Sequence, residues 1–303
     1  MQRITVLLNS RAGSGDAVPA ERVAAVFRTA GCEADIRILD GPAVAAAAED
    51  ALKGGARVIV AAGGDGTVSA AASVLAATDA ELGVLPLGTL NHFAKDIGVP
   101  LDLGEAAESI TRGRTVTVDV GDLNGRSFIN NSSIGMYASL VSERAAMQRL
   151  GRGKWLAHGM AAIRVWRRYR RLRIEVRTAK FEVGSTFELQ PSTFELSTPF
   201  VFVGNNEYQL SGLELGARKT LAGGRLHVCM APGMSRPGVA RMIIAAVFGD
   251  VRNLDGFESF TAPSVTLDAG IARLQASIDG EVVTLSNPLT FRIRSRALRV
   301  IVP

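Results

Sequence analysis

The sequence predicts an α/β amino-terminal domain built on a parallel sheet, followed by a carboxy-terminal antiparallel β-sandwich-like domain with inserted helices. Over the first 110 residues, apolar strand-like runs alternate with alanine-rich helical stretches, and such alternation is typical of a parallel sheet with helices on both faces. From residue 172 onward, short β-like runs and turn dipeptides dominate instead, which favours antiparallel sheets. We expect the first domain to cover residues 1–125 and the second to cover residues 126–303.

In the first domain, hydrophobic periodicity and β-branched residues locate the elements. Strands are expected at residues 4–9, 34–39, 58–62 and 82–87, and helices at residues 21–30, 43–52 and 68–77. The run from Val58 to Ala62 is apolar throughout, which suits a strand buried on both faces. Because ligands bind at the carboxyl ends of parallel strands, the glycine-bearing loops after three of these strands should form one site.

After Gly113, turn dipeptides separate the expected strands. A strand at 115–120 leads through Asn124-Gly125, a strong hairpin signal, into a strand at 127–130. Residues 137–171 and 237–248 have helical character, the latter with Ser235 as the expected N-cap. Further turns are expected at Asn205-Asn206, Gly223-Gly224, Asp279-Gly280 and Asn287-Pro288. The sequence leaves open whether the last strand, at 298–302, returns to the first domain.

The composition indicates a globular chain with a basic balance. Of its 303 residues 47% are hydrophobic, and its net charge of +5 fits an acidic membrane surface, a polyanion or an ordinary basic cytoplasmic protein. Cys32 and Cys229 form no ligand pattern, so we expect two reduced core thiols. No signal peptide is visible, and no apolar run reaches the ~18 residues of a membrane span. We therefore expect a cytoplasmic protein that meets lipid peripherally, at the membrane surface.

The most informative segment is the glycine-rich corner Gly63-Gly64-Asp65-Gly66-Thr67, which joins an expected strand to an expected helix. Glycines permit a sharp turn and the close approach of an anion, and the following helix presents unpaired N–H groups and the positive end of its dipole. The Asp65 carboxylate would repel a bare phosphate, but it suits a phosphate that carries a metal ion. We interpret the corner as a nucleotide-phosphate site that uses a divalent cation.

A second loop, after the strand at 82–87, offers small polar side chains at a helix start. Gly88 frees the backbone, and Thr89 and Asn91 could either cap the next helix or bind a nucleotide. Capping is the usual role of such residues taken alone. A position beside the first glycine corner favours nucleotide binding instead.

Five segments of the chain together resemble the diacylglycerol kinase catalytic family, which includes soluble bacterial lipid kinases and the sphingosine and ceramide kinases. They occur in the family's order and span nearly the whole chain, which makes the resemblance specific, whereas a lone glycine-rich loop would be a weak signal. The segments are Asn9-Ser10-Arg11-Ala12-Gly13-Ser14-Gly15, Gly63-Gly64-Asp65-Gly66-Thr67, Leu85-Pro86-Leu87-Gly88-Thr89-Leu90-Asn91, Asp119-Val120-Gly121 with Phe128-Ile129-Asn130-Asn131-Ser132-Ser133-Ile134-Gly135, and Asp279-Gly280-Glu281.

The resemblance implies an ATP-binding α/β domain, a β-sandwich-like lipid domain with a cleft between them, and ATP with Mg²⁺ as donor and cofactor. It implies that Asp65 acts through Mg²⁺ or positions the phosphates, and that Glu281 takes the proton from the attacking lipid hydroxyl. From the local sequence alone, Asp279-Gly280 before Glu281 would be an ordinary hairpin with a solvated carboxylate. The residues expected to contact ATP are Asn9, Gly63, Gly64, Asp65, Gly66, Thr67, Val68, Ser69, Gly88, Thr89 and Asn91.

The chain departs from the family pattern at two places. Family members often carry Asp after the Asn of the second loop, where this chain has His92, which could hydrogen-bond or pack in the helix. Several bacterial relatives bind a structural Mg²⁺ through an acidic Asp-Gly turn, whereas the matching residues 220–226 contain no carboxylate and include Arg225. Because Mg²⁺ prefers oxygen ligands, we expect this structural site to be missing, while a catalytic Mg²⁺ would be carried largely by ATP.

A basic stretch with aromatic neighbours is the expected point of contact with a membrane. An arginine-rich helix can lie on anionic lipid, although a solvated basic face with inward-packed Trp and Leu fits equally well. Nucleic acid is not an expected partner, because no recognised binding module accompanies the stretch. The oligomeric state is not decided by the sequence, and a homodimer remains open. The stretch contains Arg164, Arg167, Arg168, Arg170, Arg171 and Arg173, with Trp155, Trp166 and Tyr169 nearby.

We therefore expect an ATP-dependent lipid kinase, with diacylglycerol as the default acceptor and sphingoid base, ceramide, phosphatidylglycerol or another lipid alcohol as open choices. Two other functions stay in view. His92 and the turn without a carboxylate are consistent with a nucleotide-binding lipid sensor or carrier that has lost kinase activity. NAD kinases use a Gly-Gly-Asp-Gly corner on a similar fold, so a kinase of a soluble substrate is the other alternative, although the Gly88-Thr89-Leu90-Asn91 loop favours lipid.

Overall fold

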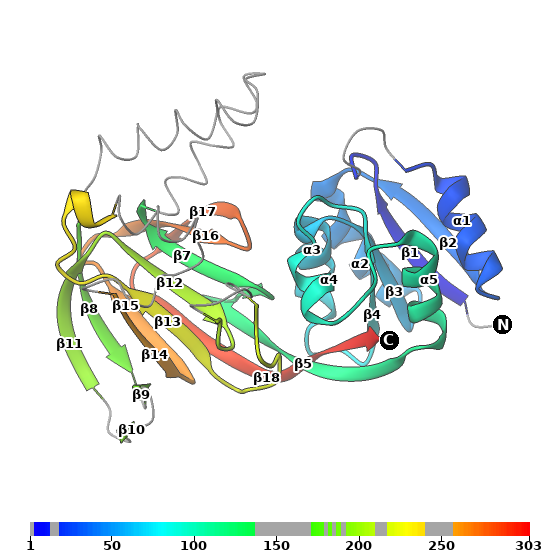
Figure 1. The fold of residues 1–303 in the computed structure, drawn as a ribbon. Helices are drawn as coiled ribbons and strands as arrows, with labels where there is room; N and C mark the ends of the chain where they lie inside the picture. Colours follow the sequence, from blue (N-terminus) through cyan, green and yellow to red (C-terminus); the bar gives the residue numbers. More distant parts are fainter. Residues whose placement is uncertain are drawn as a thin grey trace. The chain divides into compact units, whose positions relative to one another are not determined.

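The computed structural model describes residues 3–12, 18–136, 171–178, 181–183, 186–188, 192–209, 217–239 and 257–303. The chain divides into two compact units, whose elements are drawn in Figure 1. The first unit comprises Met1–Val120, Arg126–Asn130 and Arg294–Pro303. The second unit comprises Gly121–Gly125 and Asn131–Ile293.

The first unit is built on a parallel sheet with the strand order β4-β3-β1-β2. Its strands are β1 (Arg3–Asn9), β2 (Glu33–Leu39), β3 (Val58–Gly63) and β4 (Glu81–Pro86). All residues of β3 are buried, which confirms the prediction from its unbroken apolar run. The register aligns Leu8 with Ala62 and Gly63 with Pro86. The carboxyl ends of β1, β3 and β4 therefore meet at one edge of the sheet.

Helices connect these strands. α3 begins three residues before the predicted start at 68, because the N–H groups of Thr67 and Val68 both donate to the Gly64 carbonyl. α1 buries Val23 and Phe27 and leaves Glu21 exposed, as expected of an amphipathic helix on a sheet. The helices are α1 (Ala20–Thr29), η1 (Gly41–Ala43), α2 (Val44–Lys53), α3 (Asp65–Leu75), α4 (His92–Asp96) and α5 (Leu103–Arg112).

The last strand, β18 (Leu289–Val302), belongs to both units. Arg299 and Val300 pair in parallel with β4 of the first unit, and residues 289–292 pair antiparallel with β15 (Ser264–Asp268) of the second. β5 (Arg114–Leu123) pairs with β18 and with the short β6 (Arg126–Phe128). Arg296 has a φ of 51°, and its N–H donates to Asp119 Oδ1 at 2.8 Å. A buried carboxylate therefore holds the chain at this irregular position.

The second unit contains an eight-stranded sheet with the order β10-β9-β14-β13-β12-β7-β16-β17, in which every pairing is antiparallel. In the sheet that contains β15, β8 (Leu172–Thr178) pairs with β15, and β11 (Ser192–Thr198) pairs with β8. Phe194 of β11 contacts Phe260 edge-to-face, with ring centroids 6.4 Å apart. The eight strands are β7 (Asn131–Gly135), β9 (Phe181–Val183), β10 (Thr186–Glu188), β12 (Phe200–Asn205), β13 (Leu226–Met230), β14 (Glu258–Ala262), β16 (Arg273–Ile278) and β17 (Glu281–Ser286).

Two hairpins form where the dipeptides predict them. Asn124 and Gly125 have φ angles of 48° and 84°, and Asp279 and Gly280 have 45° and 86°. Two successive positive φ angles are the requirement of a type I′ turn. Both turns could be predicted from the sequence, because a type I′ turn restricts the residue types at two adjacent positions.

Other expectations fall partly or wholly outside the described residues. The helix expected at 137–171 lies there, and so does most of the one at 237–248, although residues 236–239 are helical. Of the basic stretch, Arg173 lies in β8 and pairs with Glu195 at 3.4 Å, in the region from residue 172 onward where β-like runs are expected. The residues that follow include β-branched side chains and alternate between apolar and polar, which favours a strand.

Both cysteines are buried and neither is in a disulfide, as expected of core thiols. Burial raises the pKa of the Cys229 thiol, which keeps it in the unreactive protonated form. Within the described ranges, no helix is both long and apolar enough to cross a membrane.

Candidate nucleotide-phosphate site

Three loops meet at the carboxyl edge of the parallel sheet. Asn9, at the end of β1, donates from Nδ2 to Thr67 Oγ1 at 2.9 Å. The N–H of Leu87, just after β4, donates to the carbonyl of Gly63 at 3.0 Å. The structure thus joins the first loop, the glycine corner and the second loop, as the sequence predicts for strands that end together.

Close packing explains the glycines of this edge. A Cβ at Gly63 would collide with the Thr67 hydroxyl, and a Cβ at Gly88 would collide with the backbone of Gly64. Gly64 is the N-cap of α3 and offers no side-chain acceptor. The first N–H groups of an α-helix lack partners within the helix. Here the N–H groups of Thr67 and Val68 donate to the Gly64 carbonyl, so the N–H groups of Asp65 and Gly66, beside the glycines of the corner, are the ones placed to meet an anion.

The second loop is closed by its own asparagine. Asn91 has a φ of 52°, its Oδ1 accepts from the N–H of Gly88 at 3.0 Å, and its Nδ2 donates to the Gly88 carbonyl at 2.8 Å. The side chain makes no capping bond to α4, so of the two roles left open from the sequence, helix capping is the one that the structure does not show. Thr89 is exposed at the tip of the loop. Asn91 therefore shapes the loop, and Thr89 is free to meet a ligand.

Asp65 links the two loops and leaves part of its carboxylate available. Its Oδ1 accepts from the N–H of Phe93 at 3.3 Å, a long bond to the start of α4. Mg²⁺ in kinases is commonly held by one or two carboxylates together with substrate phosphates. One aspartate beside a phosphate-binding helix start fits that requirement. Asp65 is therefore the residue of this loop cluster that would hold a Mg²⁺ carried by ATP.

The other residues singled out from the sequence near this site differ in how far their side chains are exposed to solvent. The Val68 side chain is buried in the core, so only its backbone faces the corner. Ser69 is half-buried one position further along α3. His92 is the first residue of α4 and is exposed, so the interpretation that it packs in the helix was wrong.

Glu281 lies in the second unit, at the exposed start of β17. The preceding turn is braced by a reciprocal pair of bonds. Asp279 Oδ1 accepts from the N–H of Asn131 at 3.0 Å, and the N–H of Asp279 donates to the Asn131 carbonyl at 2.8 Å. Asn131 belongs to a segment that carries the family resemblance, but its pairing with Asp279 was not predicted, because Asn131 makes both bonds through its backbone. The brace fixes the hairpin, and Glu281 remains free at its end.

An amide side chain closes the turn at residues 220–226, where the family resemblance led us to expect no structural Mg²⁺. Asn206 Oδ1 accepts from the N–H of Gly223 at 2.9 Å, and residues 220–226 contain no carboxylate. Among the residues that the structure describes, no cluster of three or more His, Cys, Asp or Glu side chains is arranged to hold a metal. The donor set of this turn therefore does not fit Mg²⁺.

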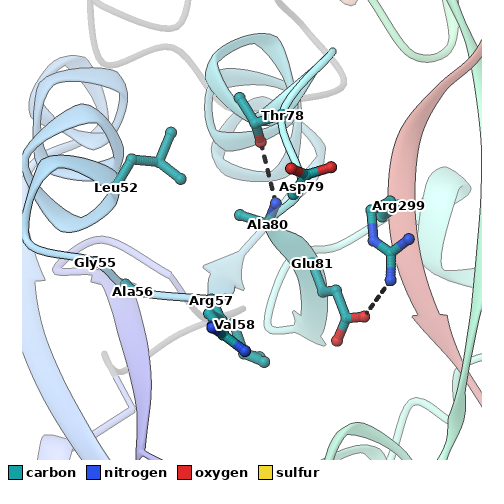
Figure 2. A pocket seen from close by; sticks show the side chains of 10 residues that line it. All are labelled: Leu52, Gly55, Ala56, Arg57, Val58, Thr78, Asp79, Ala80, Glu81 and Arg299. Atoms are coloured by element: carbon teal, nitrogen blue, oxygen red, sulfur yellow. Dashed lines mark hydrogen bonds and ion pairs between the residues drawn. The ribbon is translucent and has the colours of Figure 1, made fainter.

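A pocket of about 700 Å³ lies at the opposite edge of the sheet, at the amino ends of β3 and β4 (Figure 2). Figure 2 shows the ion pair in its wall, in which Arg299 Nη2 lies 2.8 Å from Glu81 Oε1. Thr115 Oγ1 donates to the same Glu81 oxygen at 2.9 Å. The pocket is therefore separate from the loops at the carboxyl edge, and its charged pair fastens β18 and β5 to β4.

We expect Glu81→Ala to lower the free energy of unfolding by about 1 kcal/mol, since Arg299 and Thr115 lose their shared acceptor and the pair is partly screened by solvent. Urea denaturation of the full chain measures this change. Asp79→Ala is the matched control, because Asp79 lines the same pocket and makes no ion pair or hydrogen bond within the described residues. Equal midpoints for the two variants would contradict a fastening role.

The fold and this site define a class of protein. A glycine corner at the carboxyl edge of a parallel sheet, followed by an antiparallel β unit, is the architecture expected of diacylglycerol-kinase-like and NAD-kinase-like proteins. Residues 3–123 match the family described as "Diacylglycerol kinase catalytic domain", and residues 132–302, more than half of the chain, match "YegS C-terminal NAD kinase beta sandwich-like domain". The chain belongs to the lipid kinase family that combines these two domains.

Individual relatives agree with this family. The protein named "Probable lipid kinase YegS-like" of Pseudomonas syringae pv. tomato is 29% identical over 91% of this chain and 86% of that protein. Its namesake in Cronobacter sakazakii is 29% identical, but the match spans only 58% of that protein. The "Diacylglycerol kinase" of Bacillus subtilis is 40% identical over 33% of this chain and 34% of its own length. A crystal structure of a diacylglycerol kinase from Bacillus anthracis str. Sterne has a TM-score of 0.68 at 19% identity, covering 100% of this chain and 97% of that one, which supports the fold.

Proposed function

We propose that this protein transfers the γ-phosphoryl group of ATP to a hydroxyl of diacylglycerol or a related membrane lipid. The observation that carries the proposal is the joined set of loops at the carboxyl edge of the first sheet, in a chain that belongs to a lipid kinase family. A kinase needs a phosphate cradle, a charge-neutralising group and a proton acceptor. This chain offers a candidate for each.

The phosphates of ATP are expected to lie against the start of α3. Gly66 has open space around it, Gly63 allows the close approach of Thr67, and Thr67 is held in place by Asn9. Backbone N–H groups at a helix start bind phosphate without reorganising during the reaction, so they stabilise charge that develops on the transferred group. Mg²⁺, when bound with ATP, supplies further neutralisation beside Asp65.

Glu281 is the proposed general base. Its carboxylate is exposed at the end of a braced turn, where it can accept the proton that the lipid hydroxyl loses as its oxygen attacks the γ-phosphorus. The bond from that phosphorus to the bridging oxygen then breaks, and ADP leaves with the electron pair. The transfer therefore needs no reactant other than ATP and the lipid.

Contact with a membrane is part of the proposal, because the acceptor is a lipid. The net charge of +5 favours approach to anionic lipid. The arginines Arg164, Arg167, Arg168 and Arg170, proposed to take part, lie outside the described residues.

The purified chain is expected to phosphorylate a lipid in detergent mixed micelles. The assay contains ATP labelled in the γ-position, Mg²⁺ and, in separate reactions, dioleoylglycerol, ceramide, sphingosine or phosphatidylglycerol. We expect label in extracted lipid, with dioleoylglycerol as the default acceptor, and loss of the label when EDTA is in excess. NAD replaces the lipid in a parallel reaction.

The two alternatives give distinct results in the same experiment. Label in NAD without label in any lipid would identify a kinase of a soluble substrate. Binding of ATP without transfer to any acceptor would favour the lipid sensor or carrier. Either result would overturn the proposed reaction.

A further inference from the structure

An acidic residue, Asp40, directly follows β2 at the carboxyl edge of the parallel sheet. The register aligns Leu39 of β2 with Asn9 of β1, so Asp40 lies beside the start of the first loop. The N–H of Ser10 donates to the Leu39 carbonyl at 2.8 Å, which ties the ends of the two strands together. Asp40 therefore belongs to the same edge of the sheet as the glycine corner.

The Asp40 side chain is turned toward the first loop and not toward its own helix. Asp40 is the N-cap residue of η1, yet its side chain makes no capping bond there. Its Oδ1 accepts from Ser10 Oγ at 2.7 Å and lies 3.8 Å from Arg11 Nε. The side chain is 64% exposed, and a carboxylate has room for about four hydrogen bonds. A donor group of a ligand can therefore reach it.

The first loop fixes this carboxylate relative to the proposed position of the phosphates. Asn9 Oδ1 accepts from the N–H of Arg11 at 3.0 Å, and Asn9 Nδ2 donates to Thr67 Oγ1 at 2.9 Å. In the sheet, β1 separates β2 from β3, the strand that leads into the glycine corner. Two strand spacings amount to about 10 Å. Because the ribose lies several bonds beyond the phosphates, a nucleotide held at the start of α3 can reach Asp40 with its nucleoside half.

The chemistry of a carboxylate selects the part of the nucleoside that it meets. A carboxylate repels phosphate but accepts hydrogen bonds from hydroxyl and amino groups, and such charge-assisted bonds are stronger than neutral ones. The ribose hydroxyls are the donors nearest to the phosphates, whereas the adenine amino group lies farther along the nucleotide. In dinucleotide-binding folds, too, an acidic residue bonds a ribose hydroxyl. Ribose is therefore the best match for Asp40.

We propose that Asp40 accepts a hydrogen bond from a ribose hydroxyl of ATP and thereby makes this protein selective for ribonucleotides. The inference rests on the proposed use of ATP, but it does not depend on which lipid is the acceptor. Ser10, which donates to the same carboxylate, is then a positioning residue that orients Asp40.

Calorimetric titration of the full chain with ADP tests the inference, in the presence of Mg²⁺ and without lipid. ADP carries the ribose but has no γ-phosphoryl group to transfer, so the titration measures binding alone. The analogues 2′-deoxy-ADP, 3′-deoxy-ADP and inosine diphosphate, which lacks the adenine amino group, are titrated in parallel. We expect at least one of the two deoxy analogues to bind the wild type at least ~10-fold more weakly than ADP.

Asp40→Ala should weaken the binding of ADP about 10-fold and abolish the difference between ADP and the deoxy analogues. The ratio of the affinities for ADP and inosine diphosphate should stay at its wild-type value. A purely structural role of Asp40 would instead weaken all four ligands alike. Asp35→Ala is the matched control, because Asp35 belongs to the same strand and pairs with Arg37 at 3.2 Å, and it should keep the wild-type affinities.

Several results would overturn the inference. They are equal affinities of the wild type for ADP and both deoxy analogues, a preference for ADP over the deoxy analogues that Asp40→Ala retains, and a change in Asp40→Ala confined to inosine diphosphate. Failure of the kinase proposal is distinguishable from these results. A wild type that prefers ADP to the deoxy analogues but labels no lipid would overturn the transfer reaction alone, whereas a chain that binds no ADP would overturn both.

Discussion

Asp65→Asn is expected to reduce lipid phosphorylation at least ~100-fold while leaving the fold intact, because it removes the only charge of the glycine corner but keeps an oxygen that can accept from the Phe93 N–H. Initial rates in mixed micelles at varied ATP and Mg²⁺ measure the loss. Thermal unfolding of the same sample measures the fold. The expected pattern is a normal midpoint with very low turnover.

Asp65→Ala separates the two roles of this carboxylate. It loses the charge and also the acceptor for Phe93, so it should be equally inactive and in addition slightly less stable, by up to ~1 kcal/mol. Asp50→Asn, on the exposed face of α2, is the control for a change of charge elsewhere in the first unit. Turnover of Asp65→Asn within a few-fold of the wild type would exclude Asp65 from metal and phosphate binding.

Glu281→Gln is expected to lower kcat at least ~100-fold, because an amide cannot accept the proton of the attacking hydroxyl. The KM for ATP should remain near the wild-type value. The side chain is exposed and the turn is braced through Asp279 and Asn131, so the thermal midpoint should not change. Steady-state rates with saturating lipid and varied ATP provide both constants.

Glu258→Gln is the matched control for this variant, since Glu258 is an exposed glutamate of the same eight-stranded sheet. It should keep full activity. Near-normal turnover in Glu281→Gln would show that another group accepts the proton. Asp279 would then be the next residue to test, and Asp279→Asn keeps the oxygen that accepts from Asn131.

The parts of the fold that the sequence predicts are those decided by neighbouring residues. The apolar run of β3, the strand–helix alternation and the hairpins at Asn124-Gly125 and Asp279-Gly280 each depend on a few adjacent side chains or on positive φ angles. The pairing of β18 with β4 joins residues 218 apart, as in the Arg299–Glu81 bond. Such a pairing depends on which edge is open after the rest has folded, and no local pattern encodes it.

The candidate site likewise has parts that neighbouring residues predict and parts that depend on contacts between distant loops. The glycines of the corner and of the second loop were predictable, because Gly63 and Gly88 lie where any side chain would collide with its neighbours. Only glycine fits at such positions. The bond from Asn9 to Thr67 and the bond from Phe93 to Asp65 were not predictable, because each joins loops that meet only in the folded sheet. The bonds between Asn91 and Gly88 were not predictable either, because they depend on the left-handed backbone of Asn91.

We propose that this glycine corner holds ATP while its γ-phosphoryl group passes to a membrane lipid. To test this directly, the purified chain is incubated with bacterial membrane vesicles and γ-labelled ATP, the lipids are extracted, and labelled species are identified by mass spectrometry. We expect a lipid that has gained one labelled phosphate with the wild type and not with Asp65→Asn. Label confined to inorganic phosphate or to soluble products, with every extracted lipid unlabelled, would contradict it.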